Sequence, residues 1–498
     1  MKPAETKETT YAHILKYTSL FGGVQGLSIL IGVVRNKCVA LLLGPDGMGL
    51  VSLFNSTIRL MSDSTNFGIQ MSGVRNISEA FESGDSERVD HAVRLVRFWS
   101  FLSAILGMVL CVVLSPLLNR WTFAWGDHTL HFVLLSPVVA LTAITGGETA
   151  ILKGTRQLRS LALIPILGVL GAFLISVPLY YFFGQAGIVP SLVLMALVTC
   201  LLTIAYSFRR YPLRTGASKA GLFREGSGMV RLGVAFVLAG IMGSGAEFAI
   251  RSFLNHTGDL VAVGLYNTGY MMTMTCAGLV FSAMETDYFP RLSAIPQTGA
   301  ELNEAVNRQM EVSLLIVAPL FAAFTTFLPL LLPLLFSSKF LPVMGMMHFT
   351  ILAMYLRAIL LPIEYISLSR GHSRVFLAVE TLYAVALVVC VVLGYEWKGL
   401  DGAGAGILSA MGINLLFDLS YFHHRYGYHL DRQVVKIILM QFSLGLLVFA
   451  ARSFTEGLWA WTLSLAVTAV SVICSMLVLQ RNTHLLNRLR DRIKDRLS

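Results

Sequence analysis

Long apolar segments follow one another along almost the entire chain, and no other feature limits the fold as strongly. A helix of about 20 apolar residues crosses a hydrocarbon core of about 30 Å. We therefore predict an all-α polytopic membrane protein with about fourteen transmembrane helices. The predicted spans lie near residues 17–43, 48–70, 98–118, 132–152, 160–183, 187–208, 230–252, 260–283, 312–335, 346–368, 375–395, 403–422, 434–453 and 457–479.

Positively charged residues are distributed unequally between the two sides of this predicted arrangement. Of the 38 Lys and Arg residues, 29 lie on one side, at the chain ends or in or next to the alternate loops of that side. Only Arg120, Lys339 and Lys398 lie on the other side. Loops rich in Lys and Arg stay in the cytoplasm. We therefore expect both termini in the cytoplasm. Because most of the net charge of +10 is this orientation signal, we expect no nucleic-acid partner.

The composition leaves little material for a catalytic domain. Mean hydropathy is +0.70 and only 13% of the residues are charged. The nucleotide-binding and hydrolytic motifs that we sought do not occur, and the longest predicted outer loop, residues 119–131, is too short for a catalytic domain. All six cysteines lie in predicted spans without metal-like spacing. We predict a protein that is not an enzyme and needs no cofactor or metal.

An internal repeat with a period of about 216 residues organises the chain. The aligned pairs include Arg35 with Arg251, Glu148 with Glu364, and Gly49 with Gly264. Each repeat contains six spans, so both enter the membrane from the same side, and we expect two parallel lobes related by a pseudo-two-fold axis along the membrane normal. The predicted parts are a cytoplasmic N-terminus (1–16), an N-lobe (17–208), a cytoplasmic linker (209–229), a C-lobe (230–422), a two-span appendage (423–479) and a basic amphipathic cytoplasmic tail (480–498).

Polar side chains inside the predicted spans are the candidates for a substrate site. A charge at the bilayer centre costs roughly 2.5–3.5 kcal/mol on insertion scales, so such residues usually face a cavity or a partner. The candidates for binding an anion such as a diphosphate in a cavity are Arg35, Arg251, Arg59, Arg357 and Lys37. The candidates for cavity lining or ion coupling are Asn55, Asp63, Glu148, Glu247 and Glu364.

Each of these candidates also has a structural interpretation. Arginine suits phosphate because its planar fork donates two hydrogen bonds and stays charged. However, Glu247 and Arg251 are four residues apart and could simply pair on one helix face, as could Arg59 and Asp63. The two basic residues of the first span could snorkel to an interface. The two aligned glutamates lie near cytoplasmic ends, where they could cap or gate rather than bind.

Several short motifs are distributed along the chain. They are Gly26-Leu27-Ser28, Arg35-Asn36-Lys37, Val39 to Pro45, Gly47 to Leu50, Phe67-Gly68-Ile69, Ser72 to Arg75, Leu152-Lys153-Gly154, Phe289 to Ser293, Ser337 to Phe340 and Gly402 to Ala405. These motifs resemble those of bacterial O-antigen flippases, which move lipid-linked oligosaccharides and belong to the multidrug/oligosaccharidyl-lipid/polysaccharide exporter superfamily. The resemblance covers roughly residues 15–425, and the first 75 residues are its most specific part.

The resemblance implies a flippase that moves an undecaprenyl-diphosphate-linked oligosaccharide from the cytoplasmic to the periplasmic leaflet of the bacterial inner membrane by alternating access. It also implies contacts with membrane lipids and with a polysaccharide polymerase or chain-length partner. The two extra C-terminal spans are similar to those of lipid II flippases, where such a pair borders a groove for the lipid tail. Arg35 matches one of two important arginines of that relative, whereas Arg59 falls about a turn from the second. A multidrug/cation antiporter of the same superfamily is the alternative.

Overall fold

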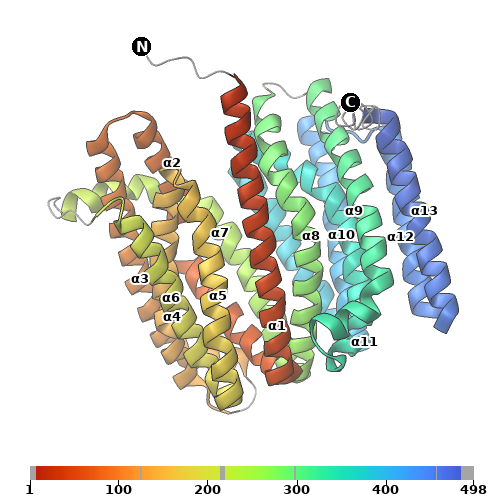
Figure 1. Cartoon of the computed structure of the whole chain (residues 1–498), viewed down its shortest axis with the longest axis horizontal. Coiled ribbons are helices and arrows are strands. Elements are labelled where there is room, and N and C mark those ends of the chain that lie inside the picture. Colours follow the sequence, from red (N-terminus) through yellow and green to blue (C-terminus); the bar gives the residue numbers. More distant parts are fainter. Residues whose placement is uncertain (1–6, 124–125, 213–218, 296–298, 456, 484–498) are drawn as a thin grey trace, which may run out of the picture. The chain divides into compact units, whose positions relative to one another are not determined.

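Every regular element of the described chain is helical (Figure 1). The structure, a computed structural model, describes residues 7–123, 126–212, 219–295, 299–455 and 457–483. Ten of its helical segments are long and apolar enough to cross a membrane. The helices are α1 (Lys7–Thr65), α2 (Ile69–Glu82), α3 (Ser86–Thr122), α4 (Thr129–Gly154), α5 (Leu158–Phe183), η1 (Gly184–Gly187), α6 (Ile188–Phe208), α7 (Lys219–Thr257), α8 (Leu260–Ala294), α9 (Ala300–Leu335), η2 (Ser338–Val343), α10 (Met344–Ser369), α11 (Ser373–Tyr426), α12 (Arg432–Phe454) and α13 (Gly457–Thr483).

Three of the ten long segments contain a break that divides each of them into two spans. Gly44 interrupts α1 with a φ of 68°, and Gly399 interrupts α11 with a φ of 57°. Glycine adopts positive φ without the steric cost of a Cβ, so it is suited to a sharp reversal. The third break is η1, which joins α5 to α6. Counting these halves separately and adding the 35-residue α8 gives fourteen segments in the described chain, which confirms the predicted helical membrane fold.

Large apolar side chains on the outer faces of the helices support this conclusion. Leu174, Phe182 and Leu416 have 68%, 74% and 72% of their surface exposed. In water, extended apolar faces would be unfavourable, whereas in a bilayer they contact lipid. Helices satisfy their own backbone hydrogen bonds, which a lipid environment requires. The chain is therefore a multi-pass membrane protein.

Helix contacts group the chain into two compact units. The first contains Met1–Gly264 with Leu335–Ser337, and the second contains Leu265–Leu334 with Ser338–Ser498. The helix α7 falls in the first unit, where it contacts α1, α2 and α3, although the repeat predicts it as the opening span of the C-lobe. The lobe boundaries taken from the repeat stay a prediction, because contact grouping and sequence symmetry divide the chain by different criteria.

Three segments predicted to lie outside the membrane are only partly described. The helix α7 begins at Lys219, so the last part of the predicted linker, residues 209–229, is helical. The predicted basic tail begins within α13, and its residues 484–498 lie outside the described residues, as do residues 1–6 of the predicted N-terminus. The amphipathic character of that tail therefore stays a prediction.

Within the first unit, α1 and α8 touch backbone to backbone. A Cβ added to Gly49 would lie 2.0 Å from the carbonyl oxygen of Leu260, and one added to Gly264 would lie 1.8 Å from that of Pro45. Both distances are far below van der Waals contact, so the two helices approach this closely only with glycine at both positions. The repeat aligns these two glycines at an offset of 215 residues, and it aligns Pro45 with Leu260 at the same offset.

The second unit contains the two-span appendage, formed by α12 and α13. Buried Gln441 of α12 donates from Nε2 to Ser475 Oγ at 2.9 Å and accepts from Ser471 Oγ at 2.7 Å. Thr468 of α13 lies 3.0 Å from Thr326 of α9, hydroxyl to hydroxyl. Hydrogen bonds between helices and small residues at the contact promote association in apolar surroundings. These hydrogen bonds hold α13 against α9 and α12.

Candidate functional site

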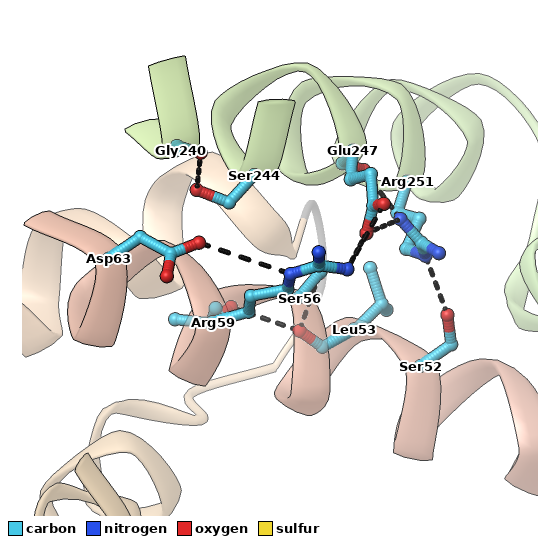
Figure 2. A network of polar contacts seen from close by, with 10 residues as sticks. Ser52, Leu53, Ser56, Arg59, Asp63, Gly240, Ser244, Glu247 and Arg251 are labelled. Carbon is cyan, nitrogen blue, oxygen red and sulfur yellow. Dashed lines mark hydrogen bonds and ion pairs between the residues drawn. The ribbon is translucent and has the colours of Figure 1, made fainter. Parts of the chain in front are cut away.

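A network of charged side chains joins α1 to α7 inside the first unit (Figure 2). Arg59 Nη1 donates to both carboxylate oxygens of Glu247, at 3.2 and 3.3 Å. Arg251 Nη1 donates to the same carboxylate at 3.3 Å, and its Nε donates to Ser52 Oγ at 2.9 Å. Asp63 lies 3.9 Å from Arg59 Nε. The structure thus brings together four of the ten predicted site residues.

The arginines of this network differ in exposure. The side chain of Arg251 is 8% exposed, whereas that of Arg59 is 62% exposed. Glu247 sits between the two guanidinium groups, so the predicted pairing of Glu247 with Arg251 is present but shared. The predicted contact of Arg59 with Asp63 is present too, at the long limit of an ion pair. Two carboxylates therefore balance two arginines, and Arg59 is the member best placed to reach a ligand.

The second half of α1 presents a polar stripe on the side of this network. Asn55, Arg59 and Asp63 are spaced four residues apart, which places them on one helix face. Asn55 is exposed and Asp63 partly exposed, whereas Ser52 and Ser56 beside the stripe are buried. The exposed side chains of this half-helix are thus polar, whereas a helix face in contact with lipid would carry apolar side chains.

Arg35, in the first half of α1, has different partners. Its Nε donates to Ser176 Oγ of α5 at 3.0 Å, and its Nη2 lies 3.4 Å from the sulfur of Met195 in α6. Among the described residues, no carboxylate lies within ion-pair distance of this guanidinium. Its positive charge is held by neutral groups. Lys37 is also partly exposed, but it is two residues away and therefore points to another side of the helix.

The second unit contains a separate group of polar side chains on α10 and α11. Arg357 and Glu364 are partly exposed and lie two turns apart on α10. Asn414 Nδ2 donates to Glu364 Oε1 at 3.2 Å. One turn further along α11, Asp418 is completely buried, and neither of its carboxylate oxygens has a hydrogen-bond partner among the described residues.

Glu148, a candidate for cavity lining or ion coupling, lies in a buried ion pair. Its carboxylate accepts two hydrogen bonds from Arg97 of α3, at 2.8 and 3.2 Å. The guanidinium of Arg97 also lies 4.1 Å from the ring centroid of Phe208. With 5% of the Glu148 side chain exposed, this geometry favours the structural interpretation. The partner residue was missed because Arg97 lies at the predicted start of a span, where arginine usually reports orientation.

Sequence reasoning also missed Ser176, Asn414 and Asp418. Serine and asparagine are common in membrane helices, and nothing in their spacing distinguishes these two. Asp418 could have been found, because it is a carboxylate within the predicted span 403–422, and such a residue is a functional candidate by default. No group of three or more His, Cys, Asp or Glu residues in the described chain is arranged to hold a metal ion.

Residues 38–345 match the family model described as "Polysaccharide biosynthesis protein". The match covers more than half of the chain and includes the whole α1–α7 network. The chain belongs to this family. A search of curated proteins found no match. The assignment agrees with the resemblance of its motifs to polysaccharide exporters and leaves the particular substrate open.

This member of the polysaccharide biosynthesis family shares its fold with solved transporters. The inward-facing structure of a MATE-family multidrug resistance transporter of the MOP superfamily has a TM-score of 0.65 at 16% identity, covering 82% of this chain and 96% of that chain. The lipid II flippase MurJ, in an inward closed conformation, has a TM-score of 0.65 at 13% identity, covering 93% and 99%. An outward-facing structure of a MATE-family transporter has a TM-score of 0.58 at 15% identity, covering 84% and 96%. These identities establish the fold alone.

Proposed function

We propose that this protein is a flippase that moves an undecaprenyl-diphosphate-linked oligosaccharide, such as an O-antigen repeat unit, from the cytoplasmic to the periplasmic leaflet of the bacterial inner membrane. The transport mode is alternating access, with both termini in the cytoplasm. A polysaccharide polymerase or chain-length protein is the expected partner. Membership in the polysaccharide biosynthesis family and the fold shared with a lipid II flippase support this proposal.

The observation that carries the proposal is the charge of Arg35. It is held by a serine hydroxyl and a methionine sulfur, without a direct counter-ion among the described residues. An arginine in that setting attracts an anion, and its planar fork matches a diphosphate. The exposed Arg59 supplies a second cation on the same helix, although Glu247 competes for it. Arg251 and Glu247 then position Arg59 rather than contact the substrate.

The polar stripe on α1 suits the sugar portion of such a substrate. Each hydroxyl buried without a partner in an apolar phase costs about 2–7 kcal/mol, so an oligosaccharide does not cross a bilayer at a useful rate. Amide, carboxylate and hydroxyl groups along α1 offer replacement hydrogen bonds. In this proposal Asn55 and Asp63 contact sugar hydroxyls, while the polyprenyl tail stays in lipid.

Membrane potential is the simplest source of energy for this transport. Moving one charge through 100 mV is worth about 2.3 kcal/mol, so a diphosphate carrying two charges outward gains roughly 4–5 kcal/mol. Ion exchange at Glu364 of the second unit is the other proposed source, together with its neighbours Arg357 and Asp418. Transport that is insensitive to both potential and ion gradients would contradict this energetic account.

The alternative is a multidrug/cation antiporter, which the similarity to MATE-family structures favours. Such a protein binds cations, and an arginine without a counter-ion would repel them. In the α1–α7 network both carboxylates already face arginines, so neither is free to bind a cationic drug. The flippase therefore accounts for the charges of the first unit better than the antiporter does.

Mass spectrometry of lipid extracts tests the proposal. Cells that lack the protein should accumulate a diphosphate-linked oligosaccharide, and the wild-type gene should clear it. Arg35→Ala should leave at least tenfold more of this lipid than wild type at equal membrane abundance. The matched control is Arg88→Ala, which removes an exposed arginine that pairs locally with Asp85. Normal lipid extracts combined with greater sensitivity to cationic drugs would support the antiporter instead.

A further inference from the structure

A pocket of about 320 Å³, lined by both charged and apolar side chains, lies in the second unit, apart from every residue discussed as a transport site. The first turns of α9 and α12 form it together with the last turns of α13. The charge distribution of the sequence predicts that these helix ends lie on the cytoplasmic side. The pocket is therefore expected at the level of the cytoplasmic lipid headgroups.

The wall between α9 and α12 is fixed by hydrogen bonds. Asn307 Nδ2 donates to the carbonyl oxygen of His429 at 2.9 Å, and Asn307 Oδ1 accepts from the backbone N–H of Asp431 at 3.0 Å. Asn303 Oδ1 accepts from the backbone N–H of His429 at 3.2 Å. Two asparagines one turn apart thus clamp the segment that precedes α12. This part of the pocket is formed before any ligand arrives.

The charges around the pocket are mixed, with an acidic excess. Glu304, Glu311 and Asp431 line it together with Arg308. Glu304, Arg308 and Asp431 are all exposed, and none of the three forms an ion pair with any residue that the structure describes. Three carboxylates and one guanidinium suit a ligand that bears a cationic group beside an anionic group. A ligand with negative charge alone would be repelled by the carboxylates.

The lining changes from charged to apolar along α9. Val312 and Leu315 follow the charged positions by one turn, toward the membrane, and Leu479 of α13 adds an apolar side chain from the opposite wall. A phospholipid has the same polarity gradient, from headgroup to acyl chain. A soluble zwitterion without an apolar chain, such as glycine, would gain nothing from these apolar contacts.

We propose that this pocket binds the headgroup of a zwitterionic phospholipid with a primary ammonium group. The ammonium donates to Glu304 and Asp431, the phosphate accepts from Arg308, and the upper acyl chain packs against Leu315. A quaternary ammonium headgroup fits less well, because it has no N–H to donate to the two carboxylates. The anionic headgroup of phosphatidylglycerol offers the phosphate without an ammonium. The lipid would stabilise the junction of α9, α12 and α13.

Native mass spectrometry of the purified full-length chain tests this inference. Phosphatidylethanolamine and phosphatidylglycerol are added in equal amounts, and bound copies are counted as detergent is removed. Wild type should retain about tenfold more phosphatidylethanolamine. The double variant Glu304→Gln with Asp431→Asn should lose that preference, and Arg308→Gln should weaken retention of both lipids. Glu301→Gln is the control, because Glu301 is exposed on the same helix but does not line the pocket.

Two outcomes would overturn the inference. The first is equal retention of the two lipids by wild type, or an unchanged preference in the double variant. The second concerns residues 484–498, which carry five basic and two acidic residues and begin five positions after Leu479. If truncation after Thr483 increases phosphatidylethanolamine retention tenfold or more, this segment is the natural occupant of the pocket. Unchanged retention by the truncated chain supports the lipid.

Discussion

The two buried carboxylates Glu148 and Asp418 differ in whether a hydrogen-bond donor lies beside them. Glu148 is buried with Arg97 in a bidentate ion pair. Asp418 is buried just as deeply, yet its carboxylate accepts no hydrogen bond from the part of the chain that the structure describes. Removing one member of a buried pair leaves an uncompensated charge. Neutralising a buried carboxylate that has no partner instead removes the free-energy cost of burying its charge. The two residues are thus expected to respond oppositely to amide substitution.

Glu148→Gln should lower the free energy of unfolding by about 3–5 kcal/mol, because Arg97 would remain charged and buried. Asp418→Asn should leave it unchanged or raise it. Thermal unfolding of the purified full chain in one detergent measures both variants side by side. A loss of stability in Asp418→Asn as large as that in Glu148→Gln would mean that a partner of Asp418 outside the described residues stabilises its charge.

Residue-scale prediction from the sequence succeeded where the geometry is local. Glu247 and Arg251 are one helical turn apart, so any helix brings them within reach of each other. Arg59 and Glu247 are 188 positions apart, and only the packing of α1 against α7 joins them. The pairing of Glu148 with Arg97, 51 positions away, is equally non-local and was not predicted. Of the ten predicted site residues, those with local partners could be paired in advance.

Helices, at the next scale, could be located from hydropathy, because a bilayer imposes both their length and their apolar composition. Their breaks were harder to predict. Gly44 and Gly399 take positive φ where α1 and α11 reverse, but the chain has 43 glycines, and most of them do not break a helix. Close contacts between helices could not be predicted either. Gly49 and Gly264 are required only because two helix backbones come into contact at these positions.

Gly49→Ala should therefore destabilise the protein severely. The new Cβ would overlap the carbonyl oxygen of Leu260, and backbone atoms cannot rotate away as a side chain does. We expect a loss of several kcal/mol, above the roughly 1–3 kcal/mol that is typical of overpacking. Gly243→Ala is the matched control, because a Cβ there meets nothing within 4 Å, and removing a glycine from a helix interior stabilises by about 0.5–1 kcal/mol. Thermal unfolding compares the two, and equal stability would contradict the close approach of α1 and α8.

For the whole molecule, the sequence repeat and the helix contacts place the division of the chain differently. The repeat predicts a first lobe that ends at residue 208. The contacts extend the first unit to Gly264, because α7 packs against α1, α2 and α3. The repeat is defined by similarity between two parts of the sequence, whereas the units are defined by contacts between helices. A helix at the start of one repeat can therefore pack against helices of the other repeat.

Membrane fragments distinguish the two divisions. The fragment 1–264 should resist limited proteolysis, whereas the fragment 1–208 should be cleaved rapidly, because α1 would expose Arg59 and Asp63 without α7. The fragment 1–264 carrying Glu247→Gln is the control for the charged network, and it should lie between the two. Equal resistance of all three fragments would favour the boundary that the repeat predicts.

The place of α7 also sets the order in which the protein can mature on the ribosome. Arg59 enters the membrane long before Glu247 is synthesised, since 188 positions separate them. At about 5–20 residues per second, the interval is roughly 10–40 s. During that time the half-helix that carries Arg59 lies in the bilayer with Asp63 at 3.9 Å but without Glu247, the closer of these two carboxylate partners. Slower elongation between α1 and α7 would lengthen the exposure, so quality-control proteases have their best opportunity before the seventh helix arrives.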